Sequence, residues 1–256
     1  MTVTSTSNLW FTSPRPNARA ALRLFCFPYA GGSSHIYRPW PEWLPPAVEI
    51  VTAHLPGRGN RINEPPYTNL LPLVRALAEV IKPRLDKPFA FFGHSMGALI
   101  CFELARWLRR EGGAHPRHLF VSGRTAPQLK TRRPSPHDLP QDEFESELRR
   151  LKGTPDEVLA HAELMQLVLP LLRADFTLIG TYEYSSEPPL AYPVSAYGAV
   201  DDEEVSRENL EDWREQTTAA FNVRMFPGGH FFLHDSRPLV LRTLARELNE
   251  VVSGSN

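Results

Sequence analysis

The sequence predicts an α/β fold, in which one domain is built on a mainly parallel sheet flanked by helices and carries a helical insertion. Three observations predict it. Short apolar runs of strand length alternate with longer segments of helical apolar spacing, the pattern of right-handed strand–helix–strand crossovers. The alternation is interrupted once, between residues 125 and 187. The length of 256 residues and the composition, 42% hydrophobic and 22% charged, fit one large globular domain.

Six short apolar runs bounded by turn-forming residues are the strand candidates: residues 22–27, 48–53, 88–92, 119–122, 193–197 and 223–226. Four segments in which apolar residues recur at helical spacing are the helix candidates: residues 68–85, 96–110, 207–217 and 239–252. Pro28 ends the first strand candidate, and the turn 56–59 follows the second. Helices placed between strands predict that most strands run parallel.

The insertion consists of a proline-rich loop followed by three helical patterns without a strand, at residues 142–151, 156–161 and 164–184. A helical insertion of this length in an α/β chain usually covers a binding site, so we interpret residues 125–187 as a lid. The alternative is an ordinary helical excursion of the core. Residues 1–20 show neither pattern and predict a loosely ordered arm, which leaves residues 21–256 as the domain.

Charge and targeting signals exclude several classes of protein. The formal net charge is −1, from 28 Lys and Arg against 29 Asp and Glu, without the basic excess of a nucleic-acid binder. No window approaches the roughly 18 unbroken apolar residues of a membrane-spanning helix, and the start has no secretory pattern. Cys26 and Cys101 lie in apolar runs, which predicts buried free thiols in a reducing compartment. We therefore expect a cytoplasmic protein that binds neither nucleic acid nor membrane.

The motif Gly93-His94-Ser95-Met96-Gly97 is the strongest chemical signal. Chance alone produces a G-x-S-x-G motif in roughly one such chain in ten. Here, however, the motif follows a strand candidate and opens a helix candidate, which is the setting of a nucleophile elbow. Side chains at Gly93 or Gly97 would collide with neighbouring backbone, while the turn exposes the Ser95 hydroxyl beside a helix N-terminus. We predict Ser95 as a nucleophile; the alternative is a spectator serine in a glycine-rich turn.

A serine hydroxyl needs a base, and His230 is the best placed of the nine histidines. It follows the last strand and a Pro-Gly-Gly turn, and it obeys the chain order of nucleophile, acid and histidine. His234 is a weaker candidate in the following turn, and His94 is expected to shape the elbow. The other histidines precede the expected acid and are interpreted as surface or loop residues: His35, His54, His115, His118, His137 and His161.

The acid is expected just after the strand at 193–197, where the chain reads Asp201-Asp202-Glu203-Glu204. A carboxylate there can hold the imidazole tautomer and stabilise the imidazolium. Asp201 and Asp202 are both candidates, and a solvated acidic turn is the alternative for either. The acidic run has no clustered His or Cys beside it, and the chain has no phosphate-binding loop, so we expect neither a metal nor a cofactor.

An oxyanion hole needs two preorganised backbone N–H groups. One is expected from Met96, which follows the nucleophile, and the other from the small residues of the loop 28–33; a plain glycine turn is the alternative for that loop. A basic cluster at the start of the insertion is either a solvated face or a docking patch for an acidic partner. Its members are Arg124, Lys130, Arg132 and Arg133.

Together these motifs resemble the type II thioesterases that accompany modular polyketide synthases and nonribosomal peptide synthetases, members of the α/β-hydrolase superfamily. The resemblance extends over nearly the whole chain after the arm. The matching segments are Phe27-Pro28-Tyr29-Ala30-Gly31-Gly32, Pro56-Gly57-Arg58, Phe92-Gly93-His94-Ser95-Met96-Gly97-Ala98, Ser122-Gly123-Arg124 and Phe226-Pro227-Gly228-Gly229-His230-Phe231-Phe232-Leu233.

The resemblance assigns Ser95 as nucleophile, His230 as base and the backbones of Ala30 and Met96 as oxyanion donors. For the acid, the family commonly has Gly-x-x-Asp-Pro-x-Val, whereas this chain has Gly-Ala-Val-Asp-Asp-Glu-Glu-Val from residue 198. Counting forward from the glycine selects Asp201, and counting back from the valine selects Asp202. The ungapped spacing to the Gly-Gly-His segment favours Asp202.

The implied activity is hydrolysis of acyl groups from the phosphopantetheine arm of acyl or peptidyl carrier proteins. Such an enzyme edits stalled or misprimed chains in polyketide or nonribosomal peptide biosynthesis, and the family favours a monomer. The implied lid covers the acyl pocket, and the basic cluster faces the acidic carrier. The alternatives are a carboxylesterase or acyltransferase on small esters, which shares the same triad, and a non-catalytic binding module, against which the ordered Ser, Asp and His candidates argue.

Overall fold

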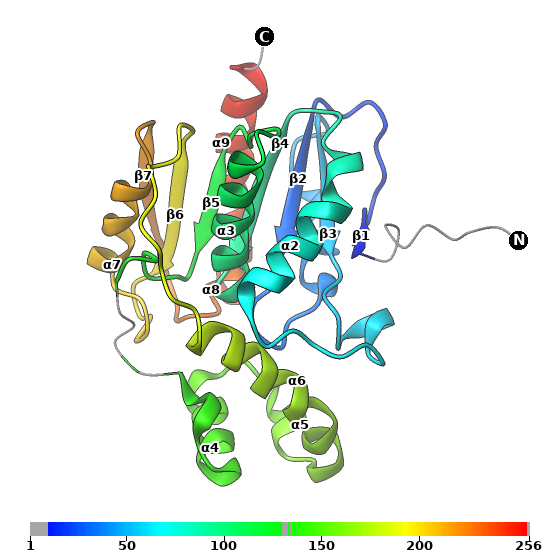
Figure 1. Ribbon diagram of the computed structural model, residues 1–256, viewed down its shortest axis with the longest axis vertical. Coiled ribbons are helices and arrows are strands. Elements are labelled where there is room, and N and C mark those ends of the chain that lie inside the picture. The colour runs from blue at the N-terminus through cyan, green and yellow to red at the C-terminus, as the bar shows by residue number, and fades with distance from the viewer. Residues whose placement is uncertain (1–9, 130–132, 134, 255–256) are drawn as a thin grey trace, which may run out of the picture.

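The computed structural model describes residues 10–129, 133 and 135–254. Its centre is a seven-stranded sheet in the order β1-β3-β2-β4-β5-β6-β7, shown in Figure 1. All neighbouring strands run parallel except β1 and β3, which confirms the expected mainly parallel sheet. The strands are β1 (Phe11–Thr12), β2 (Leu22–Phe27), β3 (Val48–Ala53), β4 (Phe89–His94), β5 (Leu119–Ser122), β6 (Val194–Ala199) and β7 (Phe221–Phe226).

Helices cover both faces of the sheet (Figure 1). The helices α2 (Leu70–Ile81) and α3 (Met96–Arg110) lie on the face turned to the viewer. Behind the sheet lies α9 (Arg237–Ser253), which is preceded by the short α8 (Phe232–Asp235). At the β6–β7 edge, α7 (Arg207–Glu211) takes up only the first half of the helix expected at 207–217, and a 3₁₀ turn, Asp212–Gln216, completes it.

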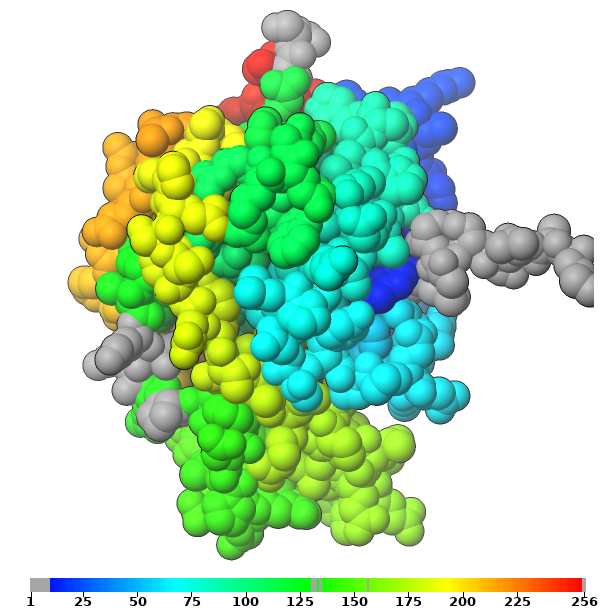
Figure 2. Space-filling view, in the orientation of Figure 1, coloured from blue at the N-terminus to red at the C-terminus, as the bar shows by residue number. Residues whose placement is uncertain are grey.

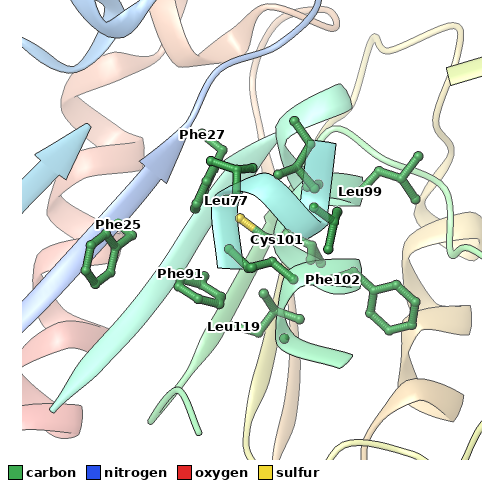
Figure 3. Close-up of a cluster of buried hydrophobic side chains, with 14 of the residues drawn as sticks. Phe25, Phe27, Leu77, Phe91, Leu99, Cys101, Phe102 and Leu119 are labelled. Atoms are coloured by element: carbon green, nitrogen blue, oxygen red, sulfur yellow. The ribbon is translucent and has the colours of Figure 1, made fainter. Parts of the chain in front are cut away.

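The central strands are apolar on both sides because both faces are covered. Phe25, Phe27 and Phe91 belong to the same buried cluster as Cys101, on the α2–α3 face of the sheet, as Figure 3 shows. Their neighbours in the strands point to the other face and pack against α9. Cys26 and Cys101 are both buried and free, as the sequence predicts.

The side chains at its two ends set the limits of α2. The side chain of Asn69 accepts a hydrogen bond from the Leu71 N–H and caps the helix start. The helix then ends at Ile81, earlier than the expected residue 85, because Pro83 cannot continue it. A 3₁₀ turn, Lys82–Arg84, takes its place.

Part of the expected N-terminal arm belongs to the sheet. Phe11 and Thr12 form β1 and pair antiparallel with the end of β3. Phe11 is 1% exposed and packs edge-on against Phe25 and Phe27, at ring distances of 5.5 and 6.2 Å. A strand of two residues has no periodicity from which it could be predicted. Residues 1–9 of the expected arm lie outside the described residues.

The insertion holds three helices: α4 (Gln141–Leu151), α5 (Asp156–Leu159) and α6 (Ala162–Gly180). They form a lobe beyond the carboxyl edge of the sheet, drawn in green to yellow-green at the bottom of Figures 1 and 2. A small apolar cluster, which includes Phe144, Leu148 and Met165, holds the lobe together. Among the described helices, none has the length and apolar character that crossing a membrane requires.

Candidate active site

Ser95 lies in the sharp turn between β4 and α3, at the carboxyl edge of the sheet. Its backbone has φ 52° and ψ −111°, a combination that residues other than glycine rarely adopt. The flanking glycines permit this turn. A Cβ on Gly93 would lie 2.1 Å from the carbonyl oxygen of Gly97, and one on Gly97 would lie 2.1 Å from that of Phe27. The motif therefore has the strand–turn–helix geometry expected of a nucleophile elbow.

The turn presents the Ser95 side chain while the rest of the elbow is buried. Ser95 is half-buried, whereas the residues on either side of it are fully enclosed. The backbone N–H of Ser95 donates to the carbonyl of Ser122 on the neighbouring strand β5 at 2.7 Å. This bond fixes the turn against the sheet, so the hydroxyl group is the part of Ser95 that is left to react.

Asp202, and not Asp201, pairs with His230. The Nδ1 atom of His230 lies 2.8 Å from Oδ2 of Asp202, and the Asp202 side chain is fully buried. The other oxygen of Asp202, Oδ1, accepts the N–H groups of Glu204 and Val205 at 2.8 and 3.2 Å. Asp201 is exposed on the turn. The structure therefore distinguishes between two carboxylates that the sequence leaves adjacent.

His230 lies beside the elbow. Its ring centroid is 5.2 Å from that of His94, the residue that immediately precedes Ser95. Because Nδ1 of His230 is paired with Asp202, the nitrogen left for a substrate or a hydroxyl group is Nε2. The structure thus gathers Ser95, His230 and Asp202 at one edge of the sheet, from the ends of β4, β7 and β6.

His94 supports the elbow from within. Its Nδ1 atom lies 2.9 Å from the hydroxyl of Ser122, and its ring is fully buried. Burial lowers the pKa of His94 well below 6.5, and the nearby His230 lowers it further, so the ring is neutral. Gly123, with φ 57°, leaves space for this ring, because a Cβ there would lie 2.6 Å from it. His94 fits the shaping role that the sequence predicts.

The weaker candidate His234 is occupied elsewhere. Its Nε2 atom lies 2.8 Å from the hydroxyl of Tyr29, whose ring packs edge-on against Phe231 at 5.0 Å. His234 therefore fixes the aromatic wall beside His230. His118 lies in the loop just before β5, within the predicted surface or loop positions, but it is not at the surface. It is buried, stacks on Phe120 at 4.2 Å and bonds the Ser195 hydroxyl at 2.9 Å.

The backbone N–H groups of Ala30 and Met96 point to no partner among the described residues. Met96 is the first residue of α3, where a helix has no internal acceptor for its N–H. In the loop after β2, Gly32 N–H donates to the Tyr29 carbonyl at 2.9 Å, and Gly31 N–H donates to Asp175 at 2.7 Å. This hydrogen-bond network thus leaves both expected oxyanion donors available.

Asp175 is a residue of the site that sequence reasoning missed. It lies on α6, and its two oxygens accept from Nη1 and Nη2 of Arg58 at 2.9 and 2.7 Å. The same Arg58 Nη1 donates to the Gly32 carbonyl at 3.2 Å. Both side chains are buried, Asp175 at 1% and Arg58 at 7% exposure. The loop at residues 28–33, which follows β2, is named the oxyanion loop. We call Asp175, Arg58 and the backbones of Gly31 and Gly32 the loop clamp, because they join the lid to the oxyanion loop.

A signal for the clamp was present in the sequence. Asp175 interrupts the apolar run of α6, and Arg58 belongs to the Pro-Gly-Arg segment of the family resemblance. The two residues are 117 positions apart, so neither pattern identifies the other as its partner. A buried-face carboxylate in an amphipathic helix needs a cation, and only the fold shows which one.

The insertion also contacts the acid loop, which follows β6 and carries Asp202, and the histidine loop, which follows β7 and carries His230. Arg150 of α4 pairs with Glu204, two residues after the acid candidate, at 2.6 Å. Gly153 lies against the ring of Phe231, so close that a Cβ there would be 2.4 Å from it. The insertion therefore touches the loops that carry His230 and Asp202, which is consistent with the predicted lid.

The two described members of the expected basic cluster, Arg124 and Arg133, differ in exposure. Arg124 is half-buried, and burial lowers the pKa of its guanidinium to about 10, so this residue does not lie on a fully solvated face. Arg133 is exposed, while Lys130 and Arg132 lie outside the described residues. Within residues 10–129, 133 and 135–254, no group of three or more His, Cys, Asp or Glu is arranged to hold a metal ion.

Comparison with known proteins agrees with the resemblance to thioesterases that the sequence motifs show. The family model described as "Thioesterase domain" matches residues 22–248. The chain belongs to the thioesterase family. It is 46% identical over 253 residues to the gramicidin S biosynthesis protein GrsT of Aneurinibacillus migulanus, a match that covers 99% of each chain.

Solved structures agree with this assignment. The thioesterase RedJ from the prodiginine pathway of Streptomyces coelicolor superposes with a TM-score of 0.85 at 43% identity, covering 90% of this chain and 91% of RedJ. The type II thioesterase BorB from the borrelidin cluster gives a TM-score of 0.85 at 36% identity, covering 94% and 98%. These matches confirm the α/β-hydrolase fold, the resemblance to type II thioesterases and the assignment as a hydrolase.

Proposed function

We propose that this thioesterase hydrolyses acyl groups from the phosphopantetheine arm of acyl or peptidyl carrier proteins. In this role it edits stalled or misprimed chains of a polyketide or nonribosomal peptide synthase. Two relatives support the setting, since GrsT is named for gramicidin S biosynthesis and BorB is a type II thioesterase of the borrelidin cluster. The matches run over nearly the full length of both relatives, so they include the lid as well as the core.

In the first step, Nε2 of His230 takes the proton of the Ser95 hydroxyl as Oγ attacks the thioester carbonyl carbon. The carbonyl oxygen becomes negative and is held by the N–H groups of Ala30 and Met96. Asp202 keeps Nδ1 of His230 protonated and stabilises the imidazolium that forms. The carbon–sulfur bond then breaks, the thiol leaves with the proton from His230, and the acyl group stays on Ser95.

In the second step, His230 takes a proton from a water molecule that attacks the acyl-serine carbonyl. The same two N–H groups hold the new oxyanion. The ester bond to Ser95 breaks, His230 returns its proton to the serine oxygen, and the carboxylic acid is released. The chemistry uses only groups of the chain, so we propose that the enzyme needs no cofactor and no metal.

The observation that carries the proposal is the buried bond of 2.8 Å between His230 and Asp202, placed beside the strained Ser95 turn. A charged carboxylate without this bond would be costly to bury. The bond to His230 offsets this cost, and it also orients the imidazole beside the nucleophile elbow. We also propose that the enzyme acts as a cytoplasmic monomer whose partners are carrier domains, and that it binds neither nucleic acid nor membrane.

The experiment compares hydrolysis of an acyl-phosphopantetheinyl carrier protein by Ser95→Ala, Asp202→Asn and Asp201→Asn. We expect Ser95→Ala to abolish acyl-enzyme formation and Asp202→Asn to lower kcat about 10³–10⁴-fold, because the wrong tautomer is favoured. Asp201→Asn is the matched control and should remain within about twofold of the wild type, since an exposed carboxylate contributes little.

Two results would contradict the proposal. Unchanged turnover by Ser95→Ala would remove the nucleophile from the mechanism. A preference of the wild type for the oxygen ester over the thioester of the same acyl group would instead favour a carboxylesterase.

A further inference from the structure

A polar hollow lies beside the oxyanion loop and belongs to none of the catalytic steps. Its volume is about 230 Å³, several times the roughly 30 Å³ that one water occupies in the liquid. Ser33, the last residue of the oxyanion loop, lines the hollow together with Ser34 and His35. His54, which follows β3, also lines the hollow.

The hollow and the oxyanion loop are neighbours by topology. The loop follows β2, His54 follows β3, and these two strands pair in parallel, so both segments leave the sheet at the same edge. Arg58 lies between them, because it lines the hollow and also donates to the Gly32 carbonyl. Because β2 also pairs in parallel with β4, which leads into Ser95, the hollow lies at the same edge of the sheet as the nucleophile, on the far side of the oxyanion loop.

The charge of the hollow comes from one free cation. The guanidinium of Arg38 lines it and has no ion pair or side-chain hydrogen bond with any described residue. Arg58 carries the second guanidinium, but its charge is neutralised by Asp175 in the loop clamp. No carboxylate is among the described residues that line the hollow. One unpaired positive charge is thus left facing a space without a counter-ion.

Hydroxyl and imidazole groups supply further donors. The ring of His54 lies between two hydroxyls, with Nε2 at 2.6 Å from Thr12 Oγ1 and Nδ1 at 3.3 Å from Ser34 Oγ. Burial first, and then the neighbouring His35 and Arg61, lower the pKa of His54 below 6.5, so the ring of His54 is neutral at pH 7. A neutral ring donates to only one of the two hydroxyls, and the hydroxyl that accepts keeps its own proton for a ligand.

We propose that this hollow binds the phosphate group of the phosphopantetheine arm, with Arg38 as its charged contact and the hydroxyls of Ser33 and Ser34 as further donors. The inference rests on the proposed function and names the part of the substrate that is recognised. The phosphodiester that joins the arm to a carrier protein bears one negative charge, and one unpaired guanidinium balances it. Guanidinium and hydroxyl donors are also the groups that proteins use to bind phosphate oxygens.

The test uses the whole enzyme with two substrates, propionyl-4′-phosphopantetheine and propionyl-pantetheine, which differ only in the phosphate. The variants are Arg38→Gln and, as the matched control, Arg75→Gln, which removes an exposed arginine of α2. We expect the wild type and Arg75→Gln to show a KM roughly tenfold lower for the phosphorylated substrate. Arg38→Gln should raise that KM to the value for propionyl-pantetheine and leave kcat unchanged.

Inorganic phosphate separates the two sources of the ligand. If the hollow holds the arm, phosphate competes with the phosphorylated thioester in the wild type and does not in Arg38→Gln. Non-competitive inhibition of both substrates would instead indicate a regulatory site for free phosphate and would overturn the proposal. Equal KM values for the two substrates in the wild type would overturn it as well.

These results are independent of the proposed function itself. Hydrolysis of propionyl-pantetheine by the wild type and by Arg38→Gln reports the thioesterase chemistry alone, and it also shows that the variant is folded. Failure of both proteins on both substrates would count against the catalytic proposal. Retention of the phosphate preference by Arg38→Gln would count only against the hollow.

Discussion

Ser95 keeps a backbone conformation that an L-residue adopts only under constraint, and two glycines make it attainable. The strain is confined to the backbone of Ser95. In return, the turn places the Ser95 hydroxyl at the start of α3 and beside His230. Of the two glycines, Gly97 is the one that joins two elements. Because it has no Cβ, the first residues of α3 can approach the carbonyl of Phe27 on β2.

We therefore expect Gly97→Ala to separate α3 from β2. The new Cβ would lie 2.1 Å from backbone atoms that cannot rotate away, so the elbow must shift. Thermal unfolding should show a loss of several kcal/mol, comparable to severe overpacking, which costs about 1–3 kcal/mol or more. Activity should fall with it. The control is Gly112→Ala, where a Cβ meets nothing within 4 Å and the cost is limited to the strain of its φ of 65°.

Buried histidines give the fold a defined response to acid. Burial lowers the pKa of His118 to about 4, against 6.5 for the free side chain. The unfolded chain thus binds a proton as the pH falls through 6.5, whereas the folded chain binds it only near 4. The stability that the neutral ring provides is complete above pH 6.5 and is lost progressively between 6.5 and 4.

His118→Gln should reduce this loss, by at most about 3 kcal/mol for a shift of this size. Urea unfolding at pH 7 and pH 4.5 measures it. Because the pKa of His94 is lowered in the same direction, the variant should keep part of the pH dependence. An equally steep dependence in His118→Gln as in the wild type would show that His118 titrates normally. His161→Gln, in an exposed residue before α6, is the control.

The elements show which features a sequence can and cannot predict. The strands at 22–27, 48–53 and 119–122 have the predicted limits, because apolar runs covered on both faces are continuous and their ends carry turn residues. The strand at 11–12 and the helix at 232–235 were missed because neither is long enough to show a period. Helix α6 ends at residue 180, before the expected 184, and the chain continues without a regular element through residue 189.

The site follows the same division. The elbow and His230 could be predicted because their motifs are contiguous and each adjoins a strand end. The pairing of Asp202 could not be derived from composition, since it depends on which neighbour accepts the N–H groups of Glu204 and Val205. The loop clamp could not be predicted either, because its strength comes from burial across 117 positions of chain.

The clamp predicts a catalytic effect for a lid residue that no substrate needs to touch. Asp175→Asn would release Gly31 and leave the Arg58 charge buried without a partner, at a cost of about 3–5 kcal/mol. We expect kcat per folded enzyme to fall about 10–100-fold with KM little changed, because the Ala30 N–H is misplaced for the oxyanion. Asp138→Asn, an exposed aspartate of the insertion, is the control.

A merely structural role for Asp175 predicts a different pattern. Stability would fall, but the kcat of the remaining folded enzyme would equal that of the wild type. Measurement of kcat at a temperature where circular dichroism shows the variant to be folded distinguishes the two.

At the scale of the whole molecule, two of the polar contacts that attach the lid to the core differ in strength. The clamp on α6 is a buried bidentate ion pair with further hydrogen bonds to the oxyanion loop. The pair between Arg150 and Glu204 that ties α4 to the acid loop is partly exposed, with side-chain exposures of 26% and 24%. An exposed pair contributes at most about 1 kcal/mol and is weakened by salt.

The lid should therefore open from its α4 end while α6 stays attached. Arg150→Gln removes the weaker contact, and we expect hydrogen exchange to become faster in α4 and α5 with little change in α6. High salt should act on the wild type in the same direction. Arg207→Gln, which breaks an exposed pair with Glu211 away from the lid, should leave the exchange of α4 unchanged. Equal acceleration in α4 and α6 would mean that the lid moves as one body, and the clamp would then not hold α6 to the oxyanion loop while the rest opens.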